Sequence, residues 1–186
     1  MKKHVKINIV RSFHYDVAYL KTYDEYLKMC CHNIKQALYI LQNHDDYHFT
    51  LEQVILIREF WNRYPGEREL LKKHVQSGRL CVAPGMFVVP DMNMCDGESL
   101  YRQFRAGKEW LKEHLNYEPE ACLIADCWGH HAQLPQILRQ SGYDYYIFWR
   151  CMRRDVMKSN FIWEGLDRSR IKTQWLARGY SGISFP

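Results

Sequence analysis

A histidine and an aspartate two positions apart, His14 and Asp16, are the first residues whose types and spacing could do chemistry. In extended backbone, side chains at i and i+2 point to the same side of the chain. An imidazole nitrogen and a carboxylate oxygen placed in this way can bind one Zn²⁺ ion, each at about 2 Å. The pair could equally be structural, with His14 packed in a core and Asp16 capping a helix that begins near Thr22. Because the H-x-D pattern is short and common, spacing alone leaves both interpretations open.

Asp126 is the third candidate, because it directly follows the apolar run 121–125 (Ala-Cys-Leu-Ile-Ala). Such a run is typical of a strand buried on both faces. Asp126 therefore stands where a loop begins, and it could either bind the same cation or cap a helix.

The other histidines give weaker indications of a metal site. His44 and His48 are four apart, but the residues between them are typical of a loop, so we expect solvated turn residues there. The neighbours His130 and His131 cannot easily both face one metal ion, although one of them could line a pocket.

The elements that must position these residues are strands that alternate with helices. Apolar residues recur at three- and four-residue steps after Thr22, and Glu25 completes a capping box, which predicts a long helix. Helices are expected over residues 22–42, 51–63, 65–78, 98–114 and 133–141, and strands over residues 4–10, 79–83, 121–125, 145–149 and 170–176. This order predicts an α/β fold with a mainly parallel β-sheet or barrel and surrounding helices.

The candidate residues share one position relative to these strands. His14 and Asp16 follow the first expected strand, Asp91 follows 79–83, Asp126 follows 121–125, and Arg150 follows 145–149. Ligands of parallel α/β folds bind at the carboxyl ends of the strands. We therefore expect these side chains to converge on one site.

Length and composition argue against two classes of protein, those that bind nucleic acid and those that span a membrane. The 186 residues suit a single domain, 1–186, and a net charge of +5 is dispersed without a basic block, which argues against nucleic-acid binding. No stretch approaches the ~18 apolar residues of a membrane span. The seven cysteines form no C-x-x-C pair, and several lie in apolar runs as reduced thiols would. We therefore expect a cytoplasmic protein without a membrane partner.

Four blocks of the sequence resemble, in order and spacing, the catalytic domain of the glycoside hydrolase family 38 α-mannosidases. The resemblance spans nearly the whole chain and covers its N-terminal part only. The blocks are residues 14–20 (His-Tyr-Asp-Val-Ala-Tyr-Leu), 85–93 (Gly-Met-Phe-Val-Val-Pro-Asp-Met-Asn), 125–130 (Ala-Asp-Cys-Trp-Gly-His) and 163–167 (Trp-Glu-Gly-Leu-Asp).

The resemblance implies an incomplete (β/α) barrel of the seven-stranded type and a zinc-dependent retaining mechanism. His14, Asp16 and Asp126 would be the zinc ligands, and Asp126 would also be the nucleophile. Arg150 would hold the Asp126 carboxylate ionised. A mannose-containing oligosaccharide or glycan would be the substrate, and the residues implied to contact it are Tyr19, Trp128, Arg150 and Asp91.

The sequence also departs from the family pattern. Ser12 replaces an additional histidine, and Tyr19 replaces a tryptophan that stacks on the substrate. The family takes its fourth zinc ligand and its general acid from segments beyond this region. We therefore expect the chain alone to be inactive, and a separate chain carrying the remaining part of the enzyme is a candidate partner.

Two other functions remain as alternatives. A metal-dependent polysaccharide deacetylase would need an aspartate pair after a strand and a paired-histidine motif, and Asp45-Asp46 with His48 lie in the wrong context. A non-catalytic carbohydrate-binding remnant would keep Tyr19 and Trp128 as stacking platforms.

Overall fold

The computed structural model describes residues 11–17, 19–153, 158–177 and 179–180, and the strands in these ranges form two sheets. The first sheet is parallel, in the order β1 (Arg11–Ser12), β2 (Phe49–Leu51), β3 (Leu80–Val82). The second has the order β4-β5-β7-β6, comprising β4 (Ala121–Ile124), β5 (Tyr145–Phe148), β7 (Arg170–Trp175) and β6 (Asn160–Glu164). Only β6 runs antiparallel to its neighbour among the strand pairs described.

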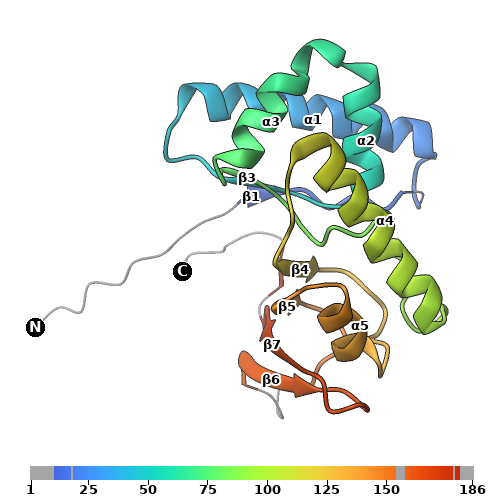
Figure 1. Ribbon diagram of the computed structural model, residues 1–186. Coiled ribbons are helices and arrows are strands. Elements are labelled where there is room, and N and C mark those ends of the chain that lie inside the picture. The colour runs from blue at the N-terminus through green and yellow to red at the C-terminus, as the bar shows by residue number, and fades with distance from the viewer. Residues whose placement is uncertain (1–10, 18, 154–157, 178, 181–186) are drawn as a thin grey trace, which may run out of the picture.

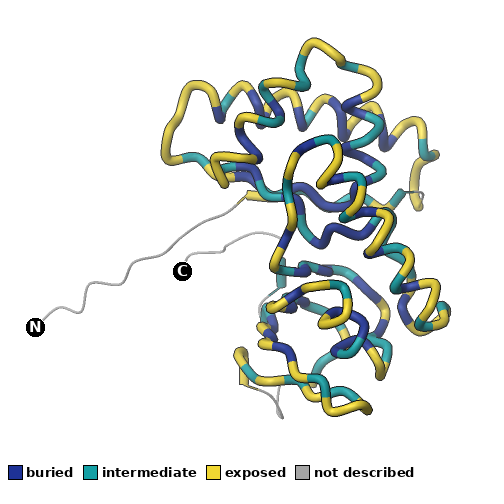
Figure 2. The backbone as a smooth tube through the Cα atoms, in the orientation of Figure 1, coloured by how far each residue is buried: buried dark blue, intermediate teal, exposed yellow. Residues whose placement is uncertain are grey.

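Helices pack against each sheet and build two hydrophobic cores (Figure 1). The first sheet is covered by α1 (Tyr23–Asn43), α2 (Val54–Arg63), the 3₁₀ turn η1 (Pro65–Glu67) and α3 (Arg68–Gln76). The second sheet packs against α4 (Gly97–Leu115) and α5 (Leu134–Gln140). Because α4 contributes Leu111 and Leu115 to the first core and Leu100 and Phe104 to the second, this helix joins the two halves. Figure 2 shows that buried backbone is concentrated where helices face sheets.

Most of the expected elements are present, and the best-defined is α1. Thr22 accepts the backbone N–H of Glu25, and the Glu25 carboxylate accepts the backbone N–H of Thr22, so the predicted capping box is formed. The expected strand over residues 4–10 lies outside the described residues. The described helices include none that is long and apolar enough to cross a membrane.

Three expectations about secondary structure and burial were wrong. The helix expected over 51–63 begins only at Val54, because residues 49–51 pair between β1 and β3 as strand β2. Strand β6 was not predicted at all. The strand expected to be buried on both faces alternates instead, because Cys122 and Ile124 are buried whereas Ala121 and Leu123 are only partly covered.

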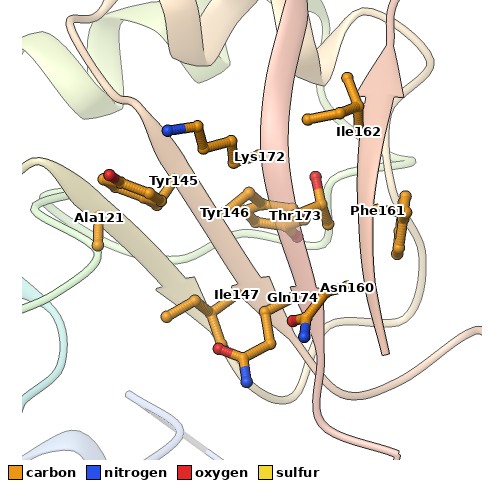
Figure 3. Close-up of a pocket in the computed structure, with 10 residues that line it drawn as sticks. All are labelled: Ala121, Tyr145, Tyr146, Ile147, Asn160, Phe161, Ile162, Lys172, Thr173 and Gln174. Atoms are coloured by element: carbon orange, nitrogen blue, oxygen red, sulfur yellow. The ribbon is translucent and has the colours of Figure 1, made fainter. Parts of the chain in front are cut away.

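The partly covered face of the second sheet forms a shallow hollow of about 560 Å³ (Figure 3). Its lining is mainly apolar, and Lys172 is the only charged residue in it. Since the lining also lacks histidines, carboxylates and thiols, this hollow offers no acid–base or metal-binding chemistry. The described strands form two sheets that do not close into a barrel. Of the two predicted alternatives, the structure therefore has the mainly parallel sheet arrangement.

The loop after β3 lies directly on α4, and a helical glycine makes this approach feasible. The backbone N–H of Phe87 donates to the carbonyl of Gln103 in α4. A Cβ atom at Gly107 would lie 1.9 Å from the carbonyl oxygen of Gly85 and 2.8 Å from the backbone nitrogen of Phe87. Neither backbone atom can move away without displacing the loop that leads to Asp91.

Gly107→Ala is therefore expected to lower the free energy of unfolding by about 3 kcal/mol, as overpacking against backbone does. Helix propensity alone would change stability by about 1 kcal/mol in the opposite direction. Urea unfolding followed by circular dichroism measures the difference. Gly66→Ala is the matched control, since a Cβ there meets no atom within 4 Å. A stabilised Gly107→Ala variant would contradict the close approach.

Candidate metal and catalytic site

Loops that follow β1, β2, β3 and β4 meet around a cavity of about 310 Å³. The loop after β1 contributes His14 and Asp16, the loop after β3 contributes Asp91, and the loop after β4 contributes Asp126. The complete lining is His14, Asp16, Val17, Gln53, Val88, Val89, Pro90, Asp91, Asp126, Cys127 and Trp128. The carboxyl ends of the strands thus bring together residues that are more than 100 positions apart in the sequence.

His14 lies at the centre of this arrangement. Its Nδ1 is 2.6 Å from Oε2 of Glu52, while its buried Nε2 has no hydrogen-bond partner among the described residues. The carboxylate oxygens nearest to Nε2 are Oδ1 of Asp16 at 3.5 Å and Oδ2 of Asp126 at 3.9 Å. One ring nitrogen is therefore held by a carboxylate, and the other faces two further carboxylates.

Asp126 is held by two groups besides its approach to His14. Arg150 forms an ion pair with it through Nε and Oδ1, and Nη2 of Arg150 donates to Oδ2 at 3.2 Å. The hydroxyl of Tyr180 donates to the same Oδ2 at 2.8 Å. The guanidinium in turn lies 4.5 Å from the ring centre of Trp128 and 4.9 Å from that of Trp149. These contacts fix the carboxylate in orientation and place a cation beside it.

Burial and the neighbouring carboxylates act in opposite directions on the titration of His14. Burial lowers its pKa, but the hydrogen bond and charge of Glu52, together with Asp16, outweigh it, so the pKa of His14 is raised. Burial raises the pKa of Glu52, against the opposing effect of His14. A cation at Nε2 competes with a proton there, so cation binding by His14 is expected to weaken as the pH falls.

The donor chemistry of His14, Asp16 and Asp126 fits a zinc ion. Zinc takes imidazole nitrogen and carboxylate oxygen, and a ligating histidine commonly donates its other N–H to a carboxylate, as His14 does to Glu52. As they stand, the described residues include no three His, Cys, Asp or Glu side chains already arranged to hold a metal ion. The nearest oxygen of Asp126 is instead engaged with Tyr180 and Arg150.

The four residues expected to contact a substrate are placed differently. Trp128 and Asp91 line the cavity, whereas Arg150 contacts Asp126 and is not part of the cavity lining. Oδ1 of Asp91 accepts the backbone N–H of Asn93. Trp128 is 69% exposed at the rim, and the guanidinium of Arg150 lies over its ring. Tyr19 is 74% exposed and does not line the cavity, so the structure does not bring it to the other three.

Two further histidines in the described part of the chain, His48 and His130, do not line this cavity. His48 lies in the turn after α1, where its Nδ1 contacts the carbonyl of Asp46, as expected for a loop residue. His130 uses both ring nitrogens, since Nδ1 is 3.0 Å from the hydroxyl of Tyr146 and Nε2 is 3.0 Å from the carbonyl of Arg150. Because a carbonyl only accepts, Nε2 of His130 carries the proton and Nδ1 accepts from Tyr146.

Acid is expected to destabilise the protein through His130. Burial lowers the pKa of His130, so the unfolded chain takes up this proton more readily than the folded protein. Its contribution to stability is complete above the ordinary histidine pKa of about 6.5 and is lost as the pH falls below that value. His130→Gln, whose amide can make the same two hydrogen bonds, should lose less stability between about pH 7.5 and pH 5 than the unmodified chain. Parallel urea titrations at both pH values measure this, and equal losses would contradict it.

Three residues of the site were missed by the sequence analysis. Glu52 and Gln53 follow β2 and lie inside the helix expected over residues 51–63, and Tyr180 follows β7 after four residues of loop. Reading Phe-Thr-Leu as a strand between two others would have placed Glu52 at the same edge as Asp126. The same rule, applied to the expected strand 170–176, would have selected Tyr180.

Comparison with known proteins gives one consistent result. The model of the glycosyl hydrolases family 38 N-terminal domain matches residues 4–184. Alpha-mannosidase G of Dictyostelium discoideum is 27% identical over 165 residues, which are 87% of this chain and 15% of that protein. Alpha-mannosidase 2 of Spodoptera frugiperda is 29% identical over 175 residues, 93% of this chain and 14% of that protein. The crystal structure of an alpha-mannosidase from Enterococcus faecalis V583 superposes with a TM-score of 0.84 at 23% identity, covering 92% of this chain and 20% of that one.

Proposed function

Since this chain belongs to glycosyl hydrolase family 38, we propose that it is the N-terminal part of the catalytic domain of a zinc-dependent retaining α-mannosidase. The observation that carries this proposal is that His14, Asp16 and Asp126 meet at one cavity. Nε2 of His14 is 3.5 Å from Oδ1 of Asp16 and 3.9 Å from Oδ2 of Asp126. The chain spans about 15% of the curated relatives that it matches, so the activity and substrate of the whole enzyme belong to the same proposal.

The proposed reaction begins with Asp126. Its carboxylate attacks the anomeric carbon of a mannoside, the bond to the leaving oxygen breaks, and a covalent glycosyl ester forms that water later hydrolyses. Arg150 contacts both carboxylate oxygens and Tyr180 contacts Oδ2, so these two residues limit the rotation of the carboxylate beside the cavity. Proton delivery to the leaving group requires a carboxylic acid, which we propose comes from another segment of the enzyme.

His14, Asp16 and Asp126 would hold the zinc ion. When bound, zinc supplies a Lewis acid that orients vicinal sugar hydroxyls, which suits the axial 2-hydroxyl that distinguishes mannose from glucose. Trp128 at the rim offers a ring face to the sugar, and Asp91 offers hydrogen-bond acceptors.

The proposed partners are a mannose-containing glycan and the remaining part of the catalytic domain, which would add the acid and a further zinc ligand. We also propose a cytoplasmic location, which is supported by the seven free cysteines.

Sugar binding with and without zinc tests the proposal. Isothermal titration of methyl α-mannoside and methyl α-glucoside into the zinc-loaded chain should give binding of the mannoside only, and a chelator should abolish it. Mannoside binding that persists in the chelator would favour the non-catalytic carbohydrate-binding alternative. Equal affinity for the two sugars would contradict recognition of the axial hydroxyl.

A further inference from the structure

Two polar residues that lie side by side in the chain are almost completely buried next to the site. Glu52 is 4% exposed and Gln53 is 3% exposed, and they occupy the turn between β2 and α2. Gln53 adopts a φ of 59°, a left-handed backbone value that is uncommon for a residue other than glycine. Burying a carboxyl group and an amide costs free energy unless each is paired, so their partners indicate what they do.

The only side chain that pairs with Glu52 in the described part of the molecule is His14. Oε2 of Glu52 lies 2.6 Å from Nδ1 of His14, a distance typical of a strong charge-assisted hydrogen bond. Because a carboxylate only accepts, this contact places a proton on Nδ1. In the neutral ring, Nε2 then carries the lone pair, and Nε2 is the buried nitrogen without a partner that faces Asp16 and Asp126.

Gln53 connects two of the loops that form the cavity. Its Nε2 donates to the carbonyl of Tyr15 at 2.7 Å, and its Oε1 accepts the backbone N–H of Val89 at 3.2 Å. The next two backbone N–H groups, those of Val54 and Ile55, donate to the carbonyls of Met86 and Phe87 at 3.0 Å each. The left-handed turn at Gln53 therefore ties the loop that carries His14 to the loop that carries Asp91.

From these contacts we propose that Glu52 is a positioning residue, which fixes the imidazole of His14 with Nε2 directed at Asp16 and Asp126, and that Gln53 holds the surrounding loops in register. This inference rests on the proposed function, because the orientation matters only if Nε2 binds a cation. Glu52 does not line the cavity, and the side-chain amide of Gln53, which does, is bonded to the backbone of two loops, so both residues act through His14 and its loop.

The first test measures the ring of His14 without metal. Nitrogen-15 chemical shifts in the metal-free chain, recorded at a pH where the ring is neutral, should show the proton on Nδ1. In Glu52→Gln the preference should weaken, because the amide can present either its oxygen or its NH₂ group to Nδ1. A proton on Nε2 in the unmodified chain would overturn the proposal, whether or not zinc binds.

The second test measures metal affinity and geometry. Glu52→Gln should weaken zinc binding about 10- to 100-fold, as loss of an outer partner of a ligating histidine does, and should change the visible absorption spectrum of the cobalt-substituted chain. Glu52→Asp should restore part of the affinity, because it keeps the negative charge. The matched control is Glu59→Gln, which makes the same change on α2 at a residue paired with Arg58.

The outcomes separate this inference from the proposed function. If the unmodified chain binds zinc and Glu52→Gln keeps the same affinity and cobalt spectrum, the positioning role is wrong while the zinc site stands. If the unmodified chain binds no zinc, the proposed function loses its metal, and the nitrogen-15 measurement still decides whether Glu52 sets the His14 ring. Should Glu52→Gln fail to fold, Glu52→Asp and the measurement on the unmodified chain give the answer.

Discussion

Replacing either His14 or Asp126 with alanine is expected to weaken zinc binding by this chain at least ~100-fold, since loss of an outer-shell partner alone costs 10- to 100-fold. The two residues come from loops that follow β1 and β4, and Nε2 of His14 lies 3.9 Å from Oδ2 of Asp126. Three protein ligands are enough to hold catalytic zinc, and removal of any one leaves too few. Isothermal titration with a competing chelator measures the dissociation constant of each variant.

Asp91, which lines the same cavity, and His131, which does not, provide matched controls for the zinc prediction. Asp91→Ala removes a carboxylate from the cavity wall, and His131→Ala removes a ring whose Nδ1 accepts the backbone N–H of Gln133. Both variants should bind zinc within about threefold of the unmodified chain, because neither side chain faces Nε2 of His14. Zinc uptake that is substoichiometric, or that survives in His14→Ala and Asp126→Ala, would remove the basis of the proposed site.

The meeting of the site residues at one place could be predicted from the sequence, because it depends only on which residues follow the strands of a parallel sheet. Polar residues directly after strand-like runs at His14, Asp126 and Arg150 were sufficient to expect one edge of a parallel arrangement. The α1 helix was equally accessible, since the capping box at Thr22 and Glu25 and a regular apolar stripe are local signals. The positions of the carboxyl ends of these strands and of the capped helix α1 can therefore be predicted from sequence patterns a few residues long.

The parts that could not be predicted depend on contacts distant in the sequence. Strand β2 has only three residues and runs into the apolar start of α2, so its period cannot be distinguished from that of a helix. Its strand character comes from pairing with β1 and β3, and missing it concealed Glu52. Likewise, β6 is an edge strand with alternating exposed and half-buried residues, and β7 is the only described strand that pairs with it.

The covalent labelling of Asp126 is expected to depend entirely on its carboxylate. We expect an α-mannosyl fluoride that carries a second fluorine at C5 to transfer one sugar to Asp126, because fluoride leaves without a proton and the C5 fluorine slows hydrolysis of the ester. The carboxylate oxygen forms the new bond to the anomeric carbon as the carbon–fluorine bond breaks. Mass spectrometry of the intact chain and of its peptides identifies the modified residue.

Asp126→Asn should be labelled at least ~1000-fold more slowly than the unmodified chain, since an amide oxygen is a far weaker nucleophile. Asp91→Asn, which alters a carboxylate on the same cavity, should be labelled at an unchanged site. A sugar found on Asp91 or Glu52 would assign the nucleophile elsewhere. If the zinc-loaded chain is not labelled at all, the retaining mechanism is refuted.

An aryl α-mannoside with a poor leaving group should not react measurably with this chain. The Asp126 carboxylate, which is paired with Arg150, can attack the anomeric carbon but cannot protonate the departing oxygen.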